Sequence, residues 1–144
     1  RLTADGLAER AVVALGAPAS TERLRETLLE ISPELAARGE KFGAVILDPP
    51  KFARGRSGAN QALMAYHRLN RVAVSLLEPG GILITCSCTG GVSREDFLLM
   101  LSGVGQKSGR DIRVLETRGA APDHPISATC LETEYLKCAI CELR

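Results

Sequence analysis

The stretch GILITCSC, residues 81–88, is an apolar run that ends in two cysteines, and it decides how the fold is interpreted. A continuous apolar run of this length is typical of a strand buried on both faces of a parallel sheet. A second such run, residues 42–47, ends in the acidic turn DPPK at residues 48–51. Because ligands of open α/β sheets sit beyond the carboxyl ends of the strands, the acidic turn and a thiol can face one pocket.

The rest of the chain alternates between strand and helix patterns. We expect further strands at residues 11–15, 112–115 and 135–143, and helices at residues 62–77 and 93–104. An amphipathic helix capped by Ser20 or Thr21 should precede them, and Ser32-Pro33 should interrupt it and start a second short helix before Gly39. Residues 78–81 predict a tight turn, and Gly109 should end the last helix. The last two strands are joined by a loop without a crossover helix, so they should pair antiparallel. The fold class is therefore α/β and Rossmann-like, with a mostly parallel sheet that ends in an antiparallel hairpin.

Size and composition indicate one domain. A chain of 144 residues with 45% hydrophobic side chains can build a buried core. Its net charge of +1 provides no general field for nucleic acid, so any RNA contact must be local. The odd number of cysteines, five, and the absence of an export signal favour reduced thiols in the cytoplasm. The apolar runs are too short to cross a membrane.

The start of the chain predicts an incomplete sheet. A doubly wound fold normally has strands before the point at which this chain begins. We therefore expect residues 1–144 to form part of a larger domain whose first strands are missing. The sheet edge left by those strands would invite self-association, unless a partner or a second copy covers it.

Several short motifs follow one another in an order that carries a family likeness. They are ILDPPKF (46–52), LLEPGGILITCSC (76–88), GR (109–110), DHP (123–125) and EYLKC (134–138). In this order they resemble the bacterial 23S ribosomal RNA cytosine-5 methyltransferases of the large-subunit methyltransferase I type. The resemblance covers nearly all of residues 42–143. It implies a class I methyltransferase domain that uses S-adenosylmethionine and acts on ribosomal RNA.

The resemblance also assigns roles to individual residues. Cys88 falls on the family's catalytic position and lies just past the strand, whereas Cys86 is nearer the buried ladder and is expected to pack. Asp48 is the second catalytic candidate, because its carboxylate would hydrogen-bond the cytosine edge. The substrate-binding candidates are Pro49, Pro50, Lys51, Phe52, Arg54 and Arg56. Asp48 and Pro49 are also the candidates for contact with the cofactor.

The chain departs from the family pattern where the cofactor would bind. The glycine-rich cofactor loop and the acidic residue that holds the cofactor ribose fall before Arg1, and the sequence GAP at residues 16–18 stands where a further acidic residue is expected. We therefore expect the isolated chain to bind the cofactor weakly or not at all. The base that removes a proton from the substrate is unassigned, with Asp123 and His124 as candidates.

Other interpretations of the same residues stay open. Asp48 could cap a turn, Arg54 and Arg56 could belong to a solvated loop, and His124 could fix its own loop. Cys138 and Cys141 have a spacing seen in zinc and redox sites. Residues three apart on a strand point to opposite faces, however, so no metal is expected there.

Two other functions remain possible at this point. A related ribosomal RNA methyltransferase could modify guanine without a thiol. Alternatively, a truncated domain could contact RNA or a partner without any activity.

Overall fold

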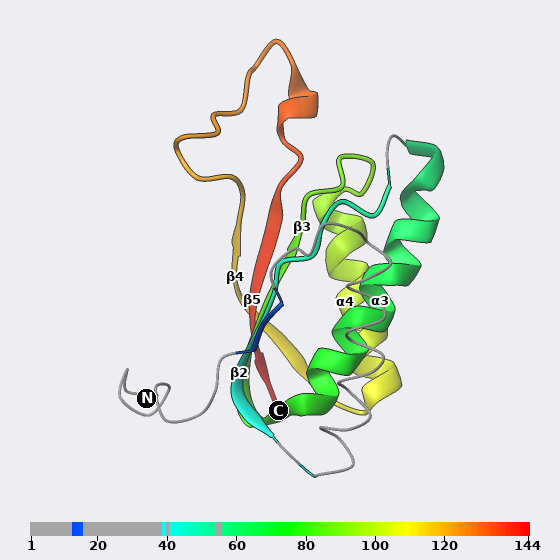
Figure 1. Cartoon of the computed structure of the whole chain (residues 1–144), viewed down its shortest axis with the longest axis vertical. Helices are drawn as coiled ribbons and strands as arrows, with labels where there is room; N and C mark the ends of the chain where they lie inside the picture. Colours follow the sequence, from blue (N-terminus) through cyan, green and yellow to red (C-terminus); the bar gives the residue numbers. More distant parts are fainter. Residues whose placement is uncertain (1–12, 16–38, 40, 54–55) are drawn as a thin grey trace.

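The computed structural model describes residues 13–15, 39, 41–53 and 56–144. Within these ranges, five strands form one sheet in the order β1-β2-β3-β5-β4. The strands are β1 (Val13–Leu15), β2 (Phe42–Leu47), β3 (Leu77–Ser87), β4 (Ile112–Arg118) and β5 (Lys137–Leu143). The helices are α3 (Ala59–Leu76) and α4 (Arg94–Ser108), with short 3-10 turns η1 (Arg56–Gly58) and η2 (Leu131–Thr133). Both α-helices lie on the same face of the sheet (Figure 1).

The first three strands run parallel and bring their carboxyl ends to one edge. Leu47 of β2 pairs with Leu15 of β1 on one side and with Thr85 of β3 on the other. The prediction of a strand at residues 42–47 is confirmed at both of its ends. The residues that follow β2 and β3 therefore emerge side by side, as expected for a parallel pair.

The tight turn predicted at residues 78–81 is wrong, because these residues lie inside β3. Phe42 of β2 pairs with Leu77, but the next register pair joins Ala44 to Ile82, so extra residues of β3 bulge out of the ladder. Gly80 occupies this bulge with a φ of 78°, a backbone region that glycine enters without a steric penalty. The same proline and glycine residues that favour a turn are compatible with a bulge.

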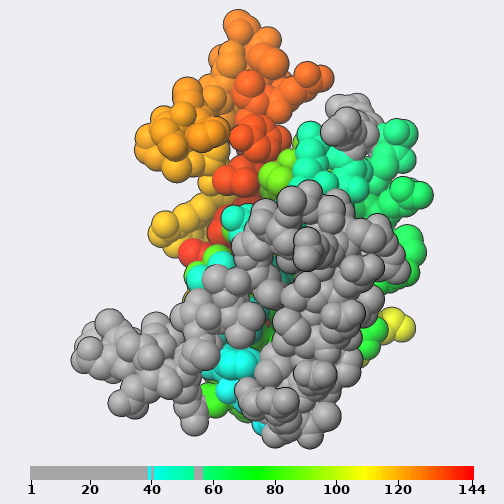
Figure 2. All heavy atoms as spheres, in the orientation of Figure 1, coloured from blue at the N-terminus to red at the C-terminus, as the bar shows by residue number. Residues whose placement is uncertain are grey.

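The C-terminal strands form the predicted antiparallel hairpin. β4 pairs with β5, and β5 also pairs antiparallel with β3 on its other side. The last strand along the chain therefore lies between β3 and β4 rather than at an edge. The connection between β4 and β5 projects beyond the rest of the described atoms, in orange in Figure 2.

Local capping interactions define the ends of α4. The hydroxyl of Ser93 accepts a hydrogen bond from the Asp96 backbone N–H at 3.0 Å, and the Asp96 carboxylate accepts one from the Ser93 N–H at 3.2 Å. This reciprocal capping box satisfies two N–H groups that have no partner within the helix. Gly109 ends the helix in the left-handed conformation, with a φ of 62°. The predicted start and end signals are confirmed, although α4 continues four residues beyond residue 104.

The helices cover the more buried side of the sheet. Leu83 of β3 and the side chains of Ala139, Cys141 and Leu143 of β5 are at most 1% exposed. Residues between them, such as Ile84 and its partner across the ladder, Ile140, are only half-buried and lie on the other face. We call this second face the open face. The alternation follows from the two-residue period of a strand.

The two helices predicted between Ser20 and Gly39 and the GAP sequence at residues 16–18 lie outside the described residues. α3 begins three residues before the predicted helix and ends one residue before its predicted end. None of the helices in the described ranges is long and apolar enough to cross a membrane.

Two leucines of α4 provide a test of this packing. Leu101 is 1% exposed, whereas Leu99 on the opposite side of the same helix is 71% exposed. We expect Leu101→Ala to lower the free energy of unfolding by about 3 kcal/mol, since it opens a cavity in the core. Leu99→Ala should change it by less than about 0.5 kcal/mol. Urea denaturation of the two variants measures this difference, and equal losses would contradict the described packing.

Candidate active site

The thiol of Cys88 lies next to the acidic turn that follows β2. Its Sγ atom is 3.9 Å from the backbone carbonyl oxygen of Pro49, to which it donates a weak hydrogen bond. Cys88 is half-buried, Asp48 is exposed, and Pro49 is buried beneath them. The structure thus brings together the thiol and the turn that the sequence predicted to face one pocket.

The buried hydroxyl of Thr89 connects the two strand ends to the helices. Its Oγ1 accepts a hydrogen bond from the Phe52 backbone N–H at 3.4 Å and shares one with the Tyr66 hydroxyl at 2.9 Å. The Phe52 ring packs edge-on against Tyr66, with ring centroids 4.7 Å apart, and Tyr66 packs against Phe97 of α4 in the same way. Burial raises the pKa of Tyr66, so its hydroxyl remains protonated and available for this hydrogen bond.

Lys137 is a buried cation at this edge, with 4% of its surface exposed. Its ammonium group donates hydrogen bonds to the carbonyl oxygens of Thr89 at 2.7 Å and Tyr135 at 2.9 Å. Burial lowers the pKa of Lys137, while attraction to Cys88 raises it. An ammonium group held in this position favours negative charge on the neighbouring sulfur.

The surroundings of Cys88 raise the pKa of its thiol. Burial raises its pKa above the ordinary value, a hydrogen bond from its own backbone N–H lowers it, and the negative charge of Asp48 raises it again. The positive charges of Lys51 and Lys137 act in the opposite direction and lower it. The charge on the sulfur is therefore set by groups on three segments, those after β2 and β3 and the first residue of β5.

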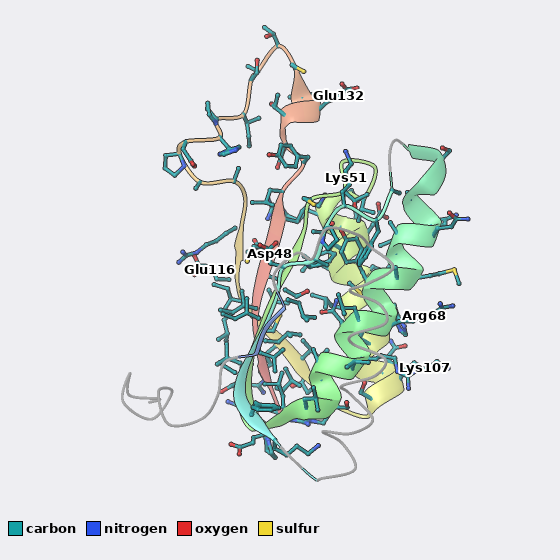
Figure 3. All side chains as sticks on the ribbon, in the orientation of Figure 1. Asp48, Lys51, Arg68, Lys107, Glu116 and Glu132 are labelled. Atoms are coloured by element: carbon teal, nitrogen blue, oxygen red, sulfur yellow. The ribbon has the colours of Figure 1, made fainter. Side chains whose placement is uncertain are left out.

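The other residues predicted to bind the substrate differ in how far they are exposed. Lys51 is exposed on the segment between β2 and α3, where Figure 3 labels it together with Asp48. Pro50 and Phe52 are half-buried. Arg54 lies outside the described residues, and the structure describes Arg56 only as the first residue of η1. The arginine part of the predicted RNA contact stays a prediction.

The two candidates for the proton-removing base lie in the projecting hairpin connection. Asp123 and His124 are both well exposed, and their side chains pair with each other at 3.3 Å. The backbone N–H of His124 also donates a hydrogen bond to the Ala121 carbonyl oxygen at 2.9 Å. These contacts fix the loop locally, in agreement with the simpler interpretation of His124, and a role as base stays a hypothesis.

Three of the four remaining cysteines lie on the sheet, on both of its faces, and the fourth, Cys130, is exposed in the connection between β4 and β5. Cys86 is half-buried on the open face and lies directly opposite Cys138 of β5. Cys141 is buried on the helix-covered face, and burial raises the pKa of its thiol to about 11. Cys138 and Cys141 thus point to opposite faces, as the strand period predicts.

Sequence reasoning missed Thr89 and Lys137. Thr89 directly follows Cys88, and Lys137 lies inside the EYLKC motif, yet neither a threonine nor a lysine by itself indicates a functional role. A buried lysine requires compensation, because transferring a charge out of water is costly. The signal available in the sequence was a lysine at a strand position whose neighbours two residues away, Tyr135 and Ala139, are apolar or aromatic.

Two surface hollows lie away from this edge. One is lined by basic and apolar side chains near the start of β2 and the end of α3, among them Lys41, Arg71 and Arg110. The other lies between α3 and α4 and includes Met64 and Leu99. Neither hollow includes Asp48 or Cys88.

Comparison with curated proteins finds relatives named Ribosomal RNA large subunit methyltransferase I. The chain is 37% identical over 122 residues to Ribosomal RNA large subunit methyltransferase I from Salmonella arizonae, an alignment that covers 85% of this chain and 30% of that protein. The proteins of the same name from Aeromonas salmonicida and Yersinia pseudotuberculosis are 36% and 37% identical, over 82% and 85% of this chain. The chain thus spans about a third of the length of these relatives (30–31%). No family model matches the chain.

Comparison with solved structures shows the fold. SMU.776, assigned as a methyltransferase and solved with SAH, superposes with a TM-score of 0.66 at 19% identity over 79% of this chain and 29% of its own. A protein from Streptococcus mutans assigned as a SAM-dependent methyltransferase gives a TM-score of 0.65 at 17% identity, over 80% of this chain and 29% of its own. The fold is a Rossmann-like methyltransferase fold. The predicted fold class is confirmed.

The charges around Cys88 predict how its reactivity depends on pH. Because the thiolate is the reactive form, the rate of alkylation by iodoacetamide rises through the thiol pKa. Asp48→Asn removes a negative charge that raises this pKa, so we expect the midpoint of the alkylation profile at lower pH. Lys51→Gln removes a positive charge that lowers it, so the midpoint should move to higher pH.

Both substituted side chains are exposed, so neither change should disturb the fold. The label on Cys88 is separated from a label on Cys86 by the fragment ions of the peptide that carries both. Shifts in the same direction for the two variants would show that the charges do not act on Cys88 as described.

Proposed function

We propose that the protein of which this chain forms the thiol-bearing part methylates carbon 5 of cytosine in 23S ribosomal RNA. In this proposal, S-adenosylmethionine supplies the methyl group and Cys88 is the covalent nucleophile. The observation that carries the proposal is the contact of 3.9 Å between Cys88 Sγ and the Pro49 carbonyl oxygen, which joins the thiol to the DPP turn. The names of the curated relatives support ribosomal RNA as the substrate, and the thiol supports carbon 5 of a pyrimidine as the target.

A thiol suits this reaction because carbon 5 of cytosine is a poor nucleophile. When the Cys88 thiolate adds to carbon 6, the ring loses its aromatic character and carbon 5 becomes enamine-like. Carbon 5 can then form a bond to the methyl group. A base removes the proton from carbon 5, the bond between sulfur and carbon 6 breaks, and the thiolate is regenerated. The thiol is thus neither consumed nor oxidised.

The position of Asp48 favours the addition step. Its carboxylate is exposed at the end of β2, on the strand next to the one that carries the thiol. Hydrogen bonding between this carboxylate and the cytosine edge would stabilise positive charge on the ring nitrogen as the thiolate attacks. The target base must be unstacked or single-stranded to reach this edge. Lys51, exposed three residues later, is positioned to meet the phosphate or the ring oxygen.

The thiol must lose its proton before it attacks. Its pKa is raised in the unliganded chain, mainly by burial, and Lys51 and Lys137 oppose this increase. Binding of cytosine against Asp48 would offset the negative charge of the carboxylate. This charge is one of the factors that raise the pKa of the thiol. Entry of the substrate would therefore favour the reactive thiolate.

The residues at this edge fit only part of a cofactor site. Asp48 offers an exposed carboxylate to a ligand, whereas Pro49 is buried and its carbonyl oxygen already contacts Cys88. These two residues would border the cofactor near its methyl group. Most of the cofactor would be held by residues outside this chain, as the departure from the family pattern predicts.

Replacement of Cys88 tests the proposal directly. In a protein with the length of the curated relatives, we expect Cys88→Ala to abolish the formation of 5-methylcytidine in ribosomal RNA, since no thiolate can add to carbon 6. Asp48→Asn should lower kcat by about a hundredfold, because one charge-stabilising group is lost. Cys86→Ala is the matched control and should retain activity. Mass spectrometry of the nucleosides measures the product.

Each alternative gives a different result. Formation of 5-methylcytidine by the Cys88→Ala protein would disprove the role of Cys88 as the nucleophile. Detection of a methylated guanosine instead of 5-methylcytidine would show that guanine is the target. RNA that contains 5-fluorocytidine adds a second readout, because fluorine cannot leave as a proton and the adduct with Cys88 persists. Calorimetry that shows S-adenosylmethionine binding to the 144-residue chain alone would exclude the inactive-domain alternative.

A further inference from the structure

A second pair of thiols lies on the open face, beside the candidate site. Cys86 of β3 and Cys138 of β5 are directly opposite each other in the antiparallel ladder. Directly opposite residues of such a pair have Cα atoms about 4.5 or 5.5 Å apart. A disulfide bond requires Cα atoms about 4.4 to 6.8 Å apart, so this position in the ladder meets its backbone requirement without movement of the strands.

The two thiols already interact. Interaction with Cys138 raises the pKa of the Cys86 thiol well above its ordinary value. The same interaction lowers the pKa of Cys138 to about 7; the attraction of Arg118 assists it, whereas burial and the negative charges of Asp48 and Glu116 oppose it. Arg118 lies opposite Cys138 on the other neighbouring strand, β4. Cys138 thus lies between the Cys86 thiol on β3 and Arg118 on β4, whose guanidinium group is itself paired with Glu116 at 2.7 Å.

The pair lies on the face of the sheet away from α3 and α4. Both Cys86 and Cys138 are half-buried, in contrast to Cys141, which is fully buried on the other face. Cys88 shares the open face, but its thiol is directed to the Pro49 carbonyl oxygen. The pair therefore forms a thiol site distinct from the proposed nucleophile.

We propose that Cys86 and Cys138 form a reversible cross-strand disulfide by exchange with low-molecular-weight disulfides such as oxidised glutathione. The Cys138 thiolate attacks one sulfur of the small disulfide, forms a mixed disulfide and releases one thiolate. Cys86 then loses its proton and attacks the Cys138 sulfur, which releases the second small thiol. The two protein thiols are oxidised by two electrons and the small disulfide is reduced to two thiols.

The order of attack follows from the two environments. The attacking group in thiol–disulfide exchange is the thiolate, and exchange is fastest for a thiol whose pKa is near the ambient pH. Cys138 meets this condition, whereas Cys86 holds its proton until Cys138 has reacted. Once Cys138 is in a mixed disulfide it no longer carries the negative charge that raises the pKa of Cys86, so Cys86 can lose its proton and complete the bond.

The test uses the 144-residue chain with Cys130→Ser, which removes an exposed thiol and leaves four of the five cysteines. After incubation with oxidised glutathione, we expect the thiols titrated in denaturant to fall from four to two per chain, and dithiothreitol to restore them. Trypsin releases residues 86 and 88 on one peptide and residues 138 and 141 on another. The cross-link therefore appears as a covalently joined pair of these peptides. Variants must identify which cysteine of each peptide takes part.

Four further variants on this background identify the bond. Cys86→Ser and Cys138→Ser should each abolish the joined peptides, while Cys88→Ser and Cys141→Ala should retain them. Cys86→Ser should also accumulate one glutathione on the peptide with Cys138, because no second thiol resolves the mixed disulfide. Circular dichroism confirms that each variant is folded.

The opposite results would overturn the inference. A folded chain that keeps four free thiols, or joined peptides that survive in Cys86→Ser or Cys138→Ser, would show that the bond does not form between these residues. Loss of the joined peptides in Cys88→Ser would assign the bond to the proposed nucleophile instead. None of these outcomes depends on methyltransferase activity.

Discussion

The hydroxyl of Thr89 holds the candidate site together, because it is the point at which three separate segments meet. Through it the backbone of Phe52 is joined to the end of β3, and the Tyr66 hydroxyl joins both to α3. A buried hydroxyl that lost these partners would destabilise the protein. The same interaction therefore holds in place both the segment of the acidic turn and the segment that carries the thiol. The edge-on rings of Phe52, Tyr66 and Phe97 then extend this connection to α4.

The consequence for the thiol is a fixed but unreactive starting state. Burial keeps Cys88 protonated, and two lysines from different segments partly oppose this effect. Free thiols in such surroundings react slowly with small electrophiles, because the thiolate is the nucleophile. In a site arranged in this way, the thiol becomes more reactive when a ligand alters the local charge.

Features marked by local residue patterns could be predicted from the sequence. The apolar run at residues 42–47 defined β2, and Ser93 with Gly109 marked the limits of α4. The proximity of Asp48 and Cys88 could also be predicted, because each follows an apolar strand of one parallel sheet. Contacts between particular distant side chains could not be predicted. Lys137 acquires its role from a carbonyl oxygen 48 residues away, and only the sheet order places it there.

The bulge in β3 shows a different limit. Residues 78–81 carry the residue types of a turn, and the chain uses their freedom to interrupt a ladder rather than to reverse direction. Local residue types do not distinguish these outcomes. The pairing of Phe42 with Leu77 on one side of the interruption decides between them.

The central place of β5 has a consequence for biosynthesis. This strand follows β4 along the chain but lies between β3 and β4, and it is the element through which they belong to one sheet. A nascent chain on the ribosome therefore cannot join β4 to the sheet until residues 137–143 have been translated and have left the exit tunnel. Until then the edge of β3 is open, and such an unpaired edge is where chaperones or neighbouring nascent chains would bind.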